Sequence, residues 1–480
     1  MRLRGDVVPP VVAVAVGFWG VTVPSFWRDE SVSAMAAVMP LRDLWRLLGA
    51  IDAVHALYYL LLRPFAAIGT NELVLRLPSV VATALAAYGV AVVGRRLASE
   101  RAGVVAGVVY ALMPIVSRYA QETRSYALVT AVAVLATWTL LNALEDRRWS
   151  RFAFYAASLA LLGWLHLFAL LIVLAHGVTV LAWRRRELLR WGAAVAGAMA
   201  VVAPLALVAS REREQVLWLQ RPGPADLLDF AHQAGGTWWA VGLLGVLVVA
   251  GTVCAFREAR PLALVALPWA FLPVLASFAI SQVEPIYHPR YLLFCVPAVA
   301  LLAGAAFLPA FLPSFRPSSP PSSRPAVLPA ALRGWRSWVV PVVVVGLLAA
   351  LTVPAQILLR QPDARPDDLR TLSSTLSAEI RPGDAVLFVP FRYRLFVGVY
   401  GSPYRVLDDL TYAPGRAKPR SRSQFRMVAG EFQRVWMVSA VPKKYCPTDV
   451  RCQALIKDSR FRRTTQRRFG RIFVTLYTRR

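Results

Sequence analysis

The sequence predicts a polytopic α-helical membrane protein that ends in a small α/β domain. Of its 480 residues 57% are hydrophobic and only 17% are charged, which exceeds the apolar content typical of soluble domains. After residue 357 the long apolar runs stop, and shorter segments with the spacing of amphipathic helices and strands follow. The first observation predicts the membrane region over residues 1–357, and the second predicts the domain over residues 358–480.

Apolar runs recur throughout residues 1–357. A membrane-spanning helix needs about 20 mainly apolar residues, and eleven runs approach this length with no charged residue in their interior. The first run is too polar at its end to be a cleaved signal peptide, because Trp27, Arg28 and Asp29 follow it in place of a small-residue cleavage site. The expected spans are 7–25, 75–94, 103–117, 125–144, 153–165, 167–183, 191–209, 238–256, 261–280, 291–312 and 338–357.

Basic residues between the spans predict the orientation. Cytoplasmic loops carry an excess of Lys and Arg, which assigns the basic connections 94–103, 145–151, 183–191, 256–260 and 313–337 to the cytoplasm. We therefore expect a plasma-membrane protein with a cytoplasmic N-terminus and an extracytoplasmic C-terminus. Residues 153–183 lie between two connections assigned to the cytoplasm, so they must cross the membrane an even number of times. We therefore expect two short helices there, which meet near His166. The Pro/Ser-rich stretch 313–337 is typical of a flexible cytoplasmic linker.

The first outer loop, residues 26–74, contains further apolar segments. Residues 41–50 and 54–68 have helical spacing but are short or interrupted by proline, which favours helices that lie at the membrane interface. They could wall a cavity at the membrane surface, or they could only anchor a long loop. The remaining outer loops are expected at 118–124, 210–237 and 281–290.

The tail domain reads as alternating helices and strands. Residues 367–391 predict a helix, a turn and a buried strand; a second strand is expected over 434–440, a helix over 449–458 and a hairpin over 462–477. Cys446 and Cys452 are expected to form a disulfide, since an extracytoplasmic compartment permits one. A metal site is the alternative, although all five histidines lie upstream. Cys254 and Cys295 are expected to be small buried residues within spans.

The formal charge of +27 is concentrated in the tail. Residues 358–480 carry 25 basic and 10 acidic side chains. An outward-facing domain does not meet nucleic acid, so membrane lipids with anionic headgroups or acidic envelope polymers are the expected partners. A solvated basic surface without a partner is the alternative.

Ionisable residues gather at the outer mouths of the spans. Three groups stand there: residues 28–30, residues 118–126 and residues 284–293. Transporters place such groups near the membrane midplane, where this sequence has none. The distribution favours a reaction at the outer surface over the two alternatives, a lipid or solute transporter and a non-catalytic scaffold that presents the basic tail.

Sugar transfer from a polyprenyl-phosphate carrier fits these groups. The donor is already activated and its lipid tail can remain in the bilayer, so no ATP is needed outside the cell. Arginine stabilises the departing phosphate, and one carboxylate can take the proton of the acceptor hydroxyl. One base and an arginine clamp predict inversion at the anomeric carbon.

Several motifs carry a resemblance to a known family. They are WRDES after the first span, HALYYLL in the first outer loop, RLPS at 76–79, RYAQETRSYAL before and within the fourth span, and RYLL at the tenth. In this order they resemble the integral-membrane glycosyltransferases with GT-C fold, and most of all the bacterial family-39 type related to protein O-mannosyltransferases and lipid A aminoarabinose transferases. The resemblance covers about residues 7–310, whereas the tail is similar only to a variable periplasmic domain.

The resemblance implies the site. Asp29 would be the catalytic base, with Glu30 beside it shaping acceptor binding. The donor would be a polyprenyl-phosphate sugar, of mannose-like hexose or pentose type, and the acceptor would be a protein, a glycolipid or a polysaccharide. Family members often have proline after the loop histidine, where this chain has His55-Ala56-Leu57. The expected substrate-binding residues are Arg28, His55, Tyr58, Glu122, Arg124, Tyr126, His288, Arg290 and Tyr291.

Each assignment has a structural alternative. Asp29 and Glu30 could be ordinary interfacial acids, Glu122 and Arg124 could form an ion pair that fixes a turn, and Arg290 could extend toward lipid headgroups. His166 and His176 are expected to pack between helices. A divalent metal could bridge the donor phosphate and Asp29, but no dense carboxylate cluster in the sequence indicates one, so no metal ligand is assigned.

Overall fold

The structure is a computed structural model that describes residues 5–49, 52–211, 219–308, 330–390, 393, 399–401, 407–411, 420–440 and 446–480. These residues divide into two units. The helical unit comprises Met1–Trp19, Arg42–Leu61 and Arg76–Leu359, and the α/β unit comprises Gly20–Leu41, Leu62–Leu75 and Arg360–Arg480. The α/β unit therefore combines the tail with two pieces of the chain that the sequence placed in the membrane region and its first outer loop.

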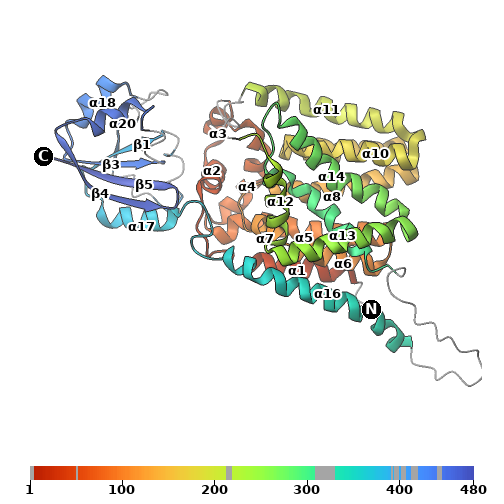
Figure 1. Cartoon of the computed structure of the whole chain (residues 1–480). Helices are drawn as coiled ribbons and strands as arrows, with labels where there is room; N and C mark the ends of the chain where they lie inside the picture. Colours follow the sequence, from red (N-terminus) through yellow and green to blue (C-terminus); the bar gives the residue numbers. More distant parts are fainter. Residues whose placement is uncertain are drawn as a thin grey trace, which may run out of the picture. The chain divides into compact units, whose positions relative to one another are not determined.

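The elements of the first 358 residues follow the apolar runs of the sequence (Figure 1). Helices suit these runs because an α-helix satisfies its own backbone hydrogen bonds where lipid offers no partners. The α-helices are α1 (Val8–Phe18), α2 (Arg28–Val38), α3 (Leu41–Leu48), α4 (Ala56–Ile68), α5 (Glu72–Leu97), α6 (Glu100–Leu112), α7 (Pro114–Ala120), α8 (Tyr126–Asp146), α9 (Trp149–Leu165), α10 (Ile172–Arg184), α11 (Leu188–Arg211), α12 (Pro224–Gly235), α13 (Trp238–Glu258), α14 (Arg260–Ile280), α15 (Val296–Ala305) and α16 (Ala330–Leu358). Among the described residues, five 3₁₀ segments accompany them: η1 (Gly5–Val7), η2 (Ala53–His55), η3 (Leu167–Leu171), η4 (Arg185–Glu187) and η6 (Pro289–Cys295).

The described residues contain six helical stretches that are long and apolar enough to cross a membrane, or seven if α6 and α7 form one bent span. These lengths, with the apolar composition, make the chain a multi-pass membrane protein. Several other expected spans are shorter helices, so the count of eleven stays a prediction. The two short helices expected within 153–183 are present, since α9 ends at Leu165 and η3 begins at Leu167 on either side of His166.

Two expected spans have different boundaries in the structure. The span expected at 7–25 is wrong in its length, because α1 ends at Phe18 and Gly20 then adopts a φ of 66°. Only glycine takes such a conformation readily. The span expected at 103–117 is bent by 65° between α6 and α7, because Pro114 has no amide hydrogen to continue the helix and begins a new one instead.

Three further expectations are corrected. The outer loop 210–237 contains helix α12, which begins with Pro224 and ends before Gly236 at a φ of 76°. The span 291–312 starts as the 3₁₀ segment η6 and becomes α-helical only at Val296, since Pro297 removes a hydrogen bond from a continuous α-helix. Helix α16 begins at Ala330, within the stretch expected to be a flexible linker, whereas linker residues 313–329 lie outside the described residues.

The tail contains a five-stranded sheet in the order β2-β1-β3-β5-β4. Strands β2 and β3 run parallel to β1, and β5 runs antiparallel to β3 and β4. The two helices, the two strands and the hairpin expected from the sequence are confirmed, while β2 and α18 were not predicted. The elements are α17 (Leu369–Glu379), β1 (Ala385–Val389), β2 (Asp408–Asp409), α18 (Arg422–Ala429), β3 (Arg434–Ser439), α20 (Val450–Ile456), β4 (Phe461–Phe469) and β5 (Ile472–Arg479).

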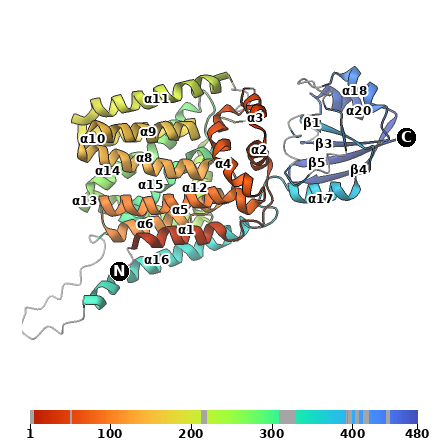
Figure 2. The ribbon, with the colours of Figure 1, turned by 180° about the vertical axis from the view of Figure 1, so that it is seen from behind.

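Alternation along the central strands builds a core on each face of the sheet. Val386 and Phe388 of β1 pack with Leu372 of α17, and their neighbour Leu387 packs with Phe425 of α18 on the opposite face. Helix α17 covers one face and helices α18 and α20 cover the other (Figures 1 and 2). Cys446 and Cys452 form a disulfide beside α20, with 5.3 Å between their Cα atoms.

Helices α13 and α15 pack so closely that a glycine is required between them. A Cβ atom added at Gly251 would lie 1.7 Å from the backbone oxygen of Leu302. Gly245, in the same helix, has no heavy atom within 4 Å of such a Cβ position. The two glycines therefore provide a matched pair that separates helix propensity from helix packing.

We predict that Gly251→Ala destabilises the protein by about 2 kcal/mol, because the two helices must move apart to admit the methyl group. Gly245→Ala should be neutral or slightly stabilising, since alanine has the higher helix propensity. Thermal unfolding in detergent measures both effects. Equal melting temperatures for the two variants would contradict the packing seen here.

Candidate functional site

The turn between α7 and α8 is buried and fixed by polar contacts. The Gln121 amide donates hydrogen bonds of 2.9 and 2.6 Å to the backbone oxygens of Gly17 and Trp19, at the end of α1, where helix carbonyls lack partners of their own. On α5, the Ser79 hydroxyl donates to the backbone oxygen of Glu122 at 2.7 Å. The turn within the sequence RYAQETRSY therefore links α7 and α8 to α1 and α5.

Arg124 extends from this turn to the first outer loop. One of its terminal nitrogens lies 2.7 Å from Nε2 of His55. Arginine can only donate, so Nε2 accepts and the neutral imidazole carries its proton on Nδ1. Burial lowers the pKa of His55, and the positive charge of Arg124 and, less strongly, that of Arg290 lower it further. His55 is therefore held as a neutral acceptor that orients Arg124.

Arg290 enters the same region from η6. Nδ1 of His288 accepts a hydrogen bond from the backbone N–H of Arg290 at 3.3 Å and so caps the start of η6. The Arg290 guanidinium lies 5.8 Å from the ring centre of Tyr126 and 5.2 Å from that of Tyr291. It also donates to the Tyr291 hydroxyl at 3.4 Å. These contacts hold the cation over two aromatic rings.

His166 joins this group, although the sequence indicated only a packing role for it. Its ring lies 5.0 Å from that of Tyr291 and 5.9 Å from that of Tyr126. His166 stands between two short helices at the expected outer surface, and this position could have identified it as a candidate site residue. We call the group the Arg124–Arg290 cluster; its members are His55, Arg124, Tyr126, His166, His288, Arg290 and Tyr291.

Glu122 and Tyr58 are placed beside other partners. The buried Glu122 carboxylate lies 4.0 Å from the Arg118 guanidinium. Tyr58 is buried in α4, with its ring 6.5 Å from that of Tyr59. Their expected substrate contacts stay predictions.

Arg28, Asp29 and Glu30 lie in the other unit, in the first turn of α2. Glu30 is buried and Asp29 is partly exposed, and both carboxylates lie where the helix dipole favours negative charge. The Arg28 guanidinium donates to both carboxylate oxygens of Asp367 at 2.7 and 2.8 Å. Its expected contact with substrate stays a prediction. The convergence of Asp29 with Arg124 and Arg290 would join the two units and stays a prediction.

The Arg124–Arg290 cluster has the chemistry of an anion site. Guanidinium groups bind phosphate through charge-assisted, bidentate hydrogen bonds, and tyrosine and histidine can add further donors. Among the described residues, no group of three or more His, Cys, Asp or Glu side chains is arranged to hold a metal ion.

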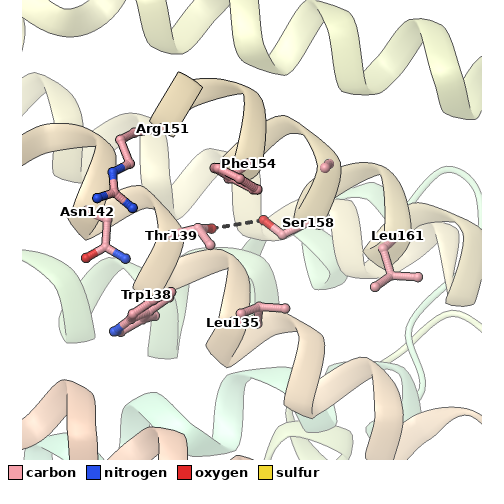
Figure 3. Close-up of a pocket in the computed structure, with 9 residues that line it drawn as sticks. Leu135, Trp138, Thr139, Asn142, Arg151, Phe154, Ser158 and Leu161 are labelled. Carbon is pink, nitrogen blue, oxygen red and sulfur yellow. Dashed lines mark hydrogen bonds between the residues drawn. The ribbon is translucent and has the colours of Figure 1, made fainter. Parts of the chain in front are cut away.

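A separate pocket of about 400 Å³ lies between α8 and α9 (Figure 3). Leu135 and Trp138 of α8 and Phe154 of α9 line it, and the Thr139 and Ser158 hydroxyls are hydrogen-bonded at 3.0 Å in its wall. Leu135 is nine residues beyond Tyr126 on α8, about 13 Å along the helix axis. None of the residues that line the pocket is one of the expected site residues.

Part of the chain matches a known protein family in sequence. Residues 55–209 match the family model described as dolichyl-phosphate-mannose-protein mannosyltransferase. This region includes the turn that carries Arg124 and the histidine that orients it. No curated protein sequence matches the chain.

Solved structures match over nearly the whole chain. ArnT from Cupriavidus metallidurans, in the apo state, covers 97% of this chain and 96% of its own, with 15% identity and a TM-score of 0.63. The same protein bound to undecaprenyl phosphate matches with 16% identity and a TM-score of 0.59, at the same coverage. The archaeal oligosaccharyltransferase AglB from Archaeoglobus fulgidus covers 98% of this chain and 73% of its own, with 11% identity and a TM-score of 0.51.

These likenesses establish the class of the protein by its fold. The chain is a multi-pass membrane protein with the GT-C fold, and its C-terminal sheet domain is included in the matched region. The resemblance expected from the sequence motifs is thereby confirmed.

The neutral state of His55 predicts a measurable pH dependence of stability. In the unfolded chain a histidine titrates near pH 6.5, whereas burial and Arg124 keep the folded pKa of His55 well below this value. The unfolded state then binds more protons in acid, so stability is fully present above about pH 6.5 and declines below it.

His55→Gln should remove the part of the pH dependence that comes from His55, because glutamine does not titrate. The glutamine side chain still offers an oxygen that can accept a hydrogen bond from Arg124. Between about pH 7.5 and pH 5, the wild type should lose about 2 kcal/mol more stability than the variant. Unfolding in detergent across this pH range measures the difference. Parallel pH profiles for the two proteins would show that His55 is protonated equally in the folded and unfolded states.

Proposed function

We propose that the protein is an inverting glycosyltransferase that moves a sugar from a polyprenyl-phosphate carrier to an acceptor hydroxyl at the outer face of the membrane. The observation that carries this proposal is the Arg124–Arg290 cluster, in which Arg124 is held by His55 and Arg290 lies over Tyr126. The fold supports it, because ArnT, which matches this chain over 97% of its residues, has been solved bound to undecaprenyl phosphate.

The cluster would bind the donor phosphate. Arg124 is preorganised by His55 and Arg290 by Tyr291, so neither side chain needs to be ordered when the donor arrives. As the bond between the anomeric carbon and the phosphate oxygen breaks, its electron pair moves onto the phosphate. The two cations stabilise this growing negative charge, which needs no protonating acid.

Asp29 would act on the acceptor. Its carboxylate takes the proton of the acceptor hydroxyl as that oxygen forms a bond to the anomeric carbon on the face opposite the phosphate. Asp29 is partly exposed and lies at the start of α2, which suits a base that receives an acceptor from outside. Buried Glu30 would shape the acceptor side of the site, and Tyr58, Glu122, His288 and Tyr291 the donor side.

The finer points of this function are also proposals. The donor sugar is a mannose-like hexose or a pentose, and the acceptor is a protein, a glycolipid or a polysaccharide. The N-terminus would lie in the cytoplasm and the α/β unit outside, where an undecaprenyl-type carrier presents its sugar. In this arrangement, residues 1–357 form the transmembrane module, which includes the outer loop 26–74, and residues 358–480 form the outer domain.

Asp29→Asn tests the proposal. Asparagine is nearly isosteric with aspartate but cannot take the proton, so transfer should fall at least about 100-fold while undecaprenyl phosphate binding stays unchanged. A deletion strain, compared by mass spectrometry with its parent, identifies the envelope glycan or glycoprotein that depends on the gene. Restoration of that product by the variant, at matched protein levels, measures transfer. Titration with undecaprenyl phosphate in nanodiscs measures binding.

Asp43→Asn is the matched control. Asp43 lies in α3 of the same outer loop, and its exposed carboxylate forms an ion pair of 3.2 Å with Arg46, three residues further along the helix. Removal of this charge should leave transfer intact. Full restoration by Asp29→Asn would refute the role of Asp29 as base. A deletion strain with unchanged envelope glycans would point to a transporter or a scaffold instead.

A further inference from the structure

The α/β unit contains the helix that carries Asp29, and the contacts between that helix and the tail domain are specific. Asp367 lies just before α17, 339 residues from Arg28 along the chain. Its fully buried carboxylate receives the Arg28 guanidinium through two hydrogen bonds and the Arg28 backbone N–H at 3.3 Å. Asp367 therefore caps the start of α2 as well as neutralising its first side chain.

A second contact holds the chain just before α2. The backbone N–H of Phe26 donates to the Tyr400 hydroxyl oxygen at 2.6 Å, and the two rings lie 5.8 Å apart. The Tyr400 hydroxyl in turn donates to the carboxylate of Glu72, which also receives the Arg370 guanidinium. Glu72 begins α5, so this small network connects the two ends of the first outer loop to the tail.

A third set of contacts surrounds the same segment. Arg370 of α17 donates to the backbone oxygens of Thr22 and Val23 at 2.8 and 3.2 Å. On the other side of Asp29, Val32 packs against the apolar core that α17 forms with the sheet. The segment from Thr22 to Val32 is thus held by the tail domain on both sides of Asp29.

We propose that the tail domain positions the catalytic base. Asp367, Tyr400, Arg370 and Glu72 are positioning residues that fix the backbone around Asp29, and Arg28 is part of this clamp rather than a ligand of the donor. The inference rests on the function proposed above, since it assumes that Asp29 is the base. It also gives the tail a role in catalysis besides its basic surface.

The physical reason is the geometric demand on a general base. A catalytic group must be held within about 0.5 Å of its productive position, and a displacement of about 1 Å can reduce the rate about 100-fold. Asp29 lies in the first turn of a helix, and the ends of helices fray when their amide groups lack partners. The cap provided by Asp367 opposes this fraying one residue before Asp29.

Asp367→Asn tests the inference directly. The change removes the negative charge while it keeps the size of the side chain, so amides of residues 23–38 should exchange hydrogen at least about tenfold faster. Product restored in the deletion strain should fall between about 10-fold and 100-fold, whereas undecaprenyl phosphate affinity should stay within about twofold. The exchange measurement needs no substrate, so it is independent of the proposed activity.

Two further variants keep the result interpretable. Tyr400→Phe removes a single hydroxyl and should reproduce both effects in weaker form, which covers the case in which Asp367→Asn fails to fold. The exchanged pair Arg28→Asp with Asp367→Arg should recover part of the transfer lost in either single variant. Asp458→Asn is the control, because this carboxylate of the same domain pairs locally with Arg460 and should change neither readout.

The outcomes separate the two proposals. Unchanged exchange over 23–38, or full product restoration by Asp367→Asn and Tyr400→Phe, overturns the positioning role while the function stands. A weaker affinity for undecaprenyl phosphate in Asp367→Asn overturns it as well, because the clamp would then serve the donor. If the wild-type protein restores no product, the proposed function fails first, and the positioning of a catalytic base fails with it.

Discussion

The buried turn between α7 and α8 is the constraint on which the arrangement of the helical unit depends. Buried backbone and side-chain polar groups require partners, and this turn obtains them from α1, α5 and η2 through Gln121, Ser79 and Arg124. Each contact satisfies a buried group and also fixes the direction of a helix. The same contacts orient Arg124, so the stability of the bundle and the geometry of the anion site have one origin.

Cations, not carboxylates, dominate the cluster in the helical unit. Arg290 lies over the rings of Tyr126 and Tyr291, and the charges of Arg124 and Arg290 both act on the neutral His55. Two positive charges in a partly buried region repel each other, and a bound phosphate would relieve this repulsion. The proposed donor thus complements the charge that the helical unit assembles.

Much of the architecture could be predicted from local patterns. Apolar runs gave the helices, and period-two alternation with a Pro-Gly-Asp turn gave β1 and the helix before it. Interruptions were harder, because one residue decides them: Pro114 bends a span, Gly20 ends α1 early and Pro297 delays α15. Helix α18 and the short β2 were missed, since their apolar positions are too few to stand out from a loop.

The residues of the candidate site could be selected from the composition and order of the motifs, but the contacts that each residue makes could not. Arg124 and Arg290 were singled out because charged residues at the mouths of spans are unusual, and His55 because the HALYYLL motif resembles a known family. His166 was left out because a lone histidine in an apolar run has no local signal. The ion pair of Arg28 could not be predicted from the sequence, since its partner Asp367 lies 339 residues away. Long-range ion pairs have no signature in the local pattern.

A structure of the full chain in nanodiscs with undecaprenyl phosphate bound tests the central claim most directly. The account predicts the phosphate within about 3 Å of both Arg124 and Arg290, with the Asp29 carboxylate across the space where a sugar would stand. A phosphate bound elsewhere, for instance between α8 and α9, or an Asp29 side chain directed away from that space, would contradict it.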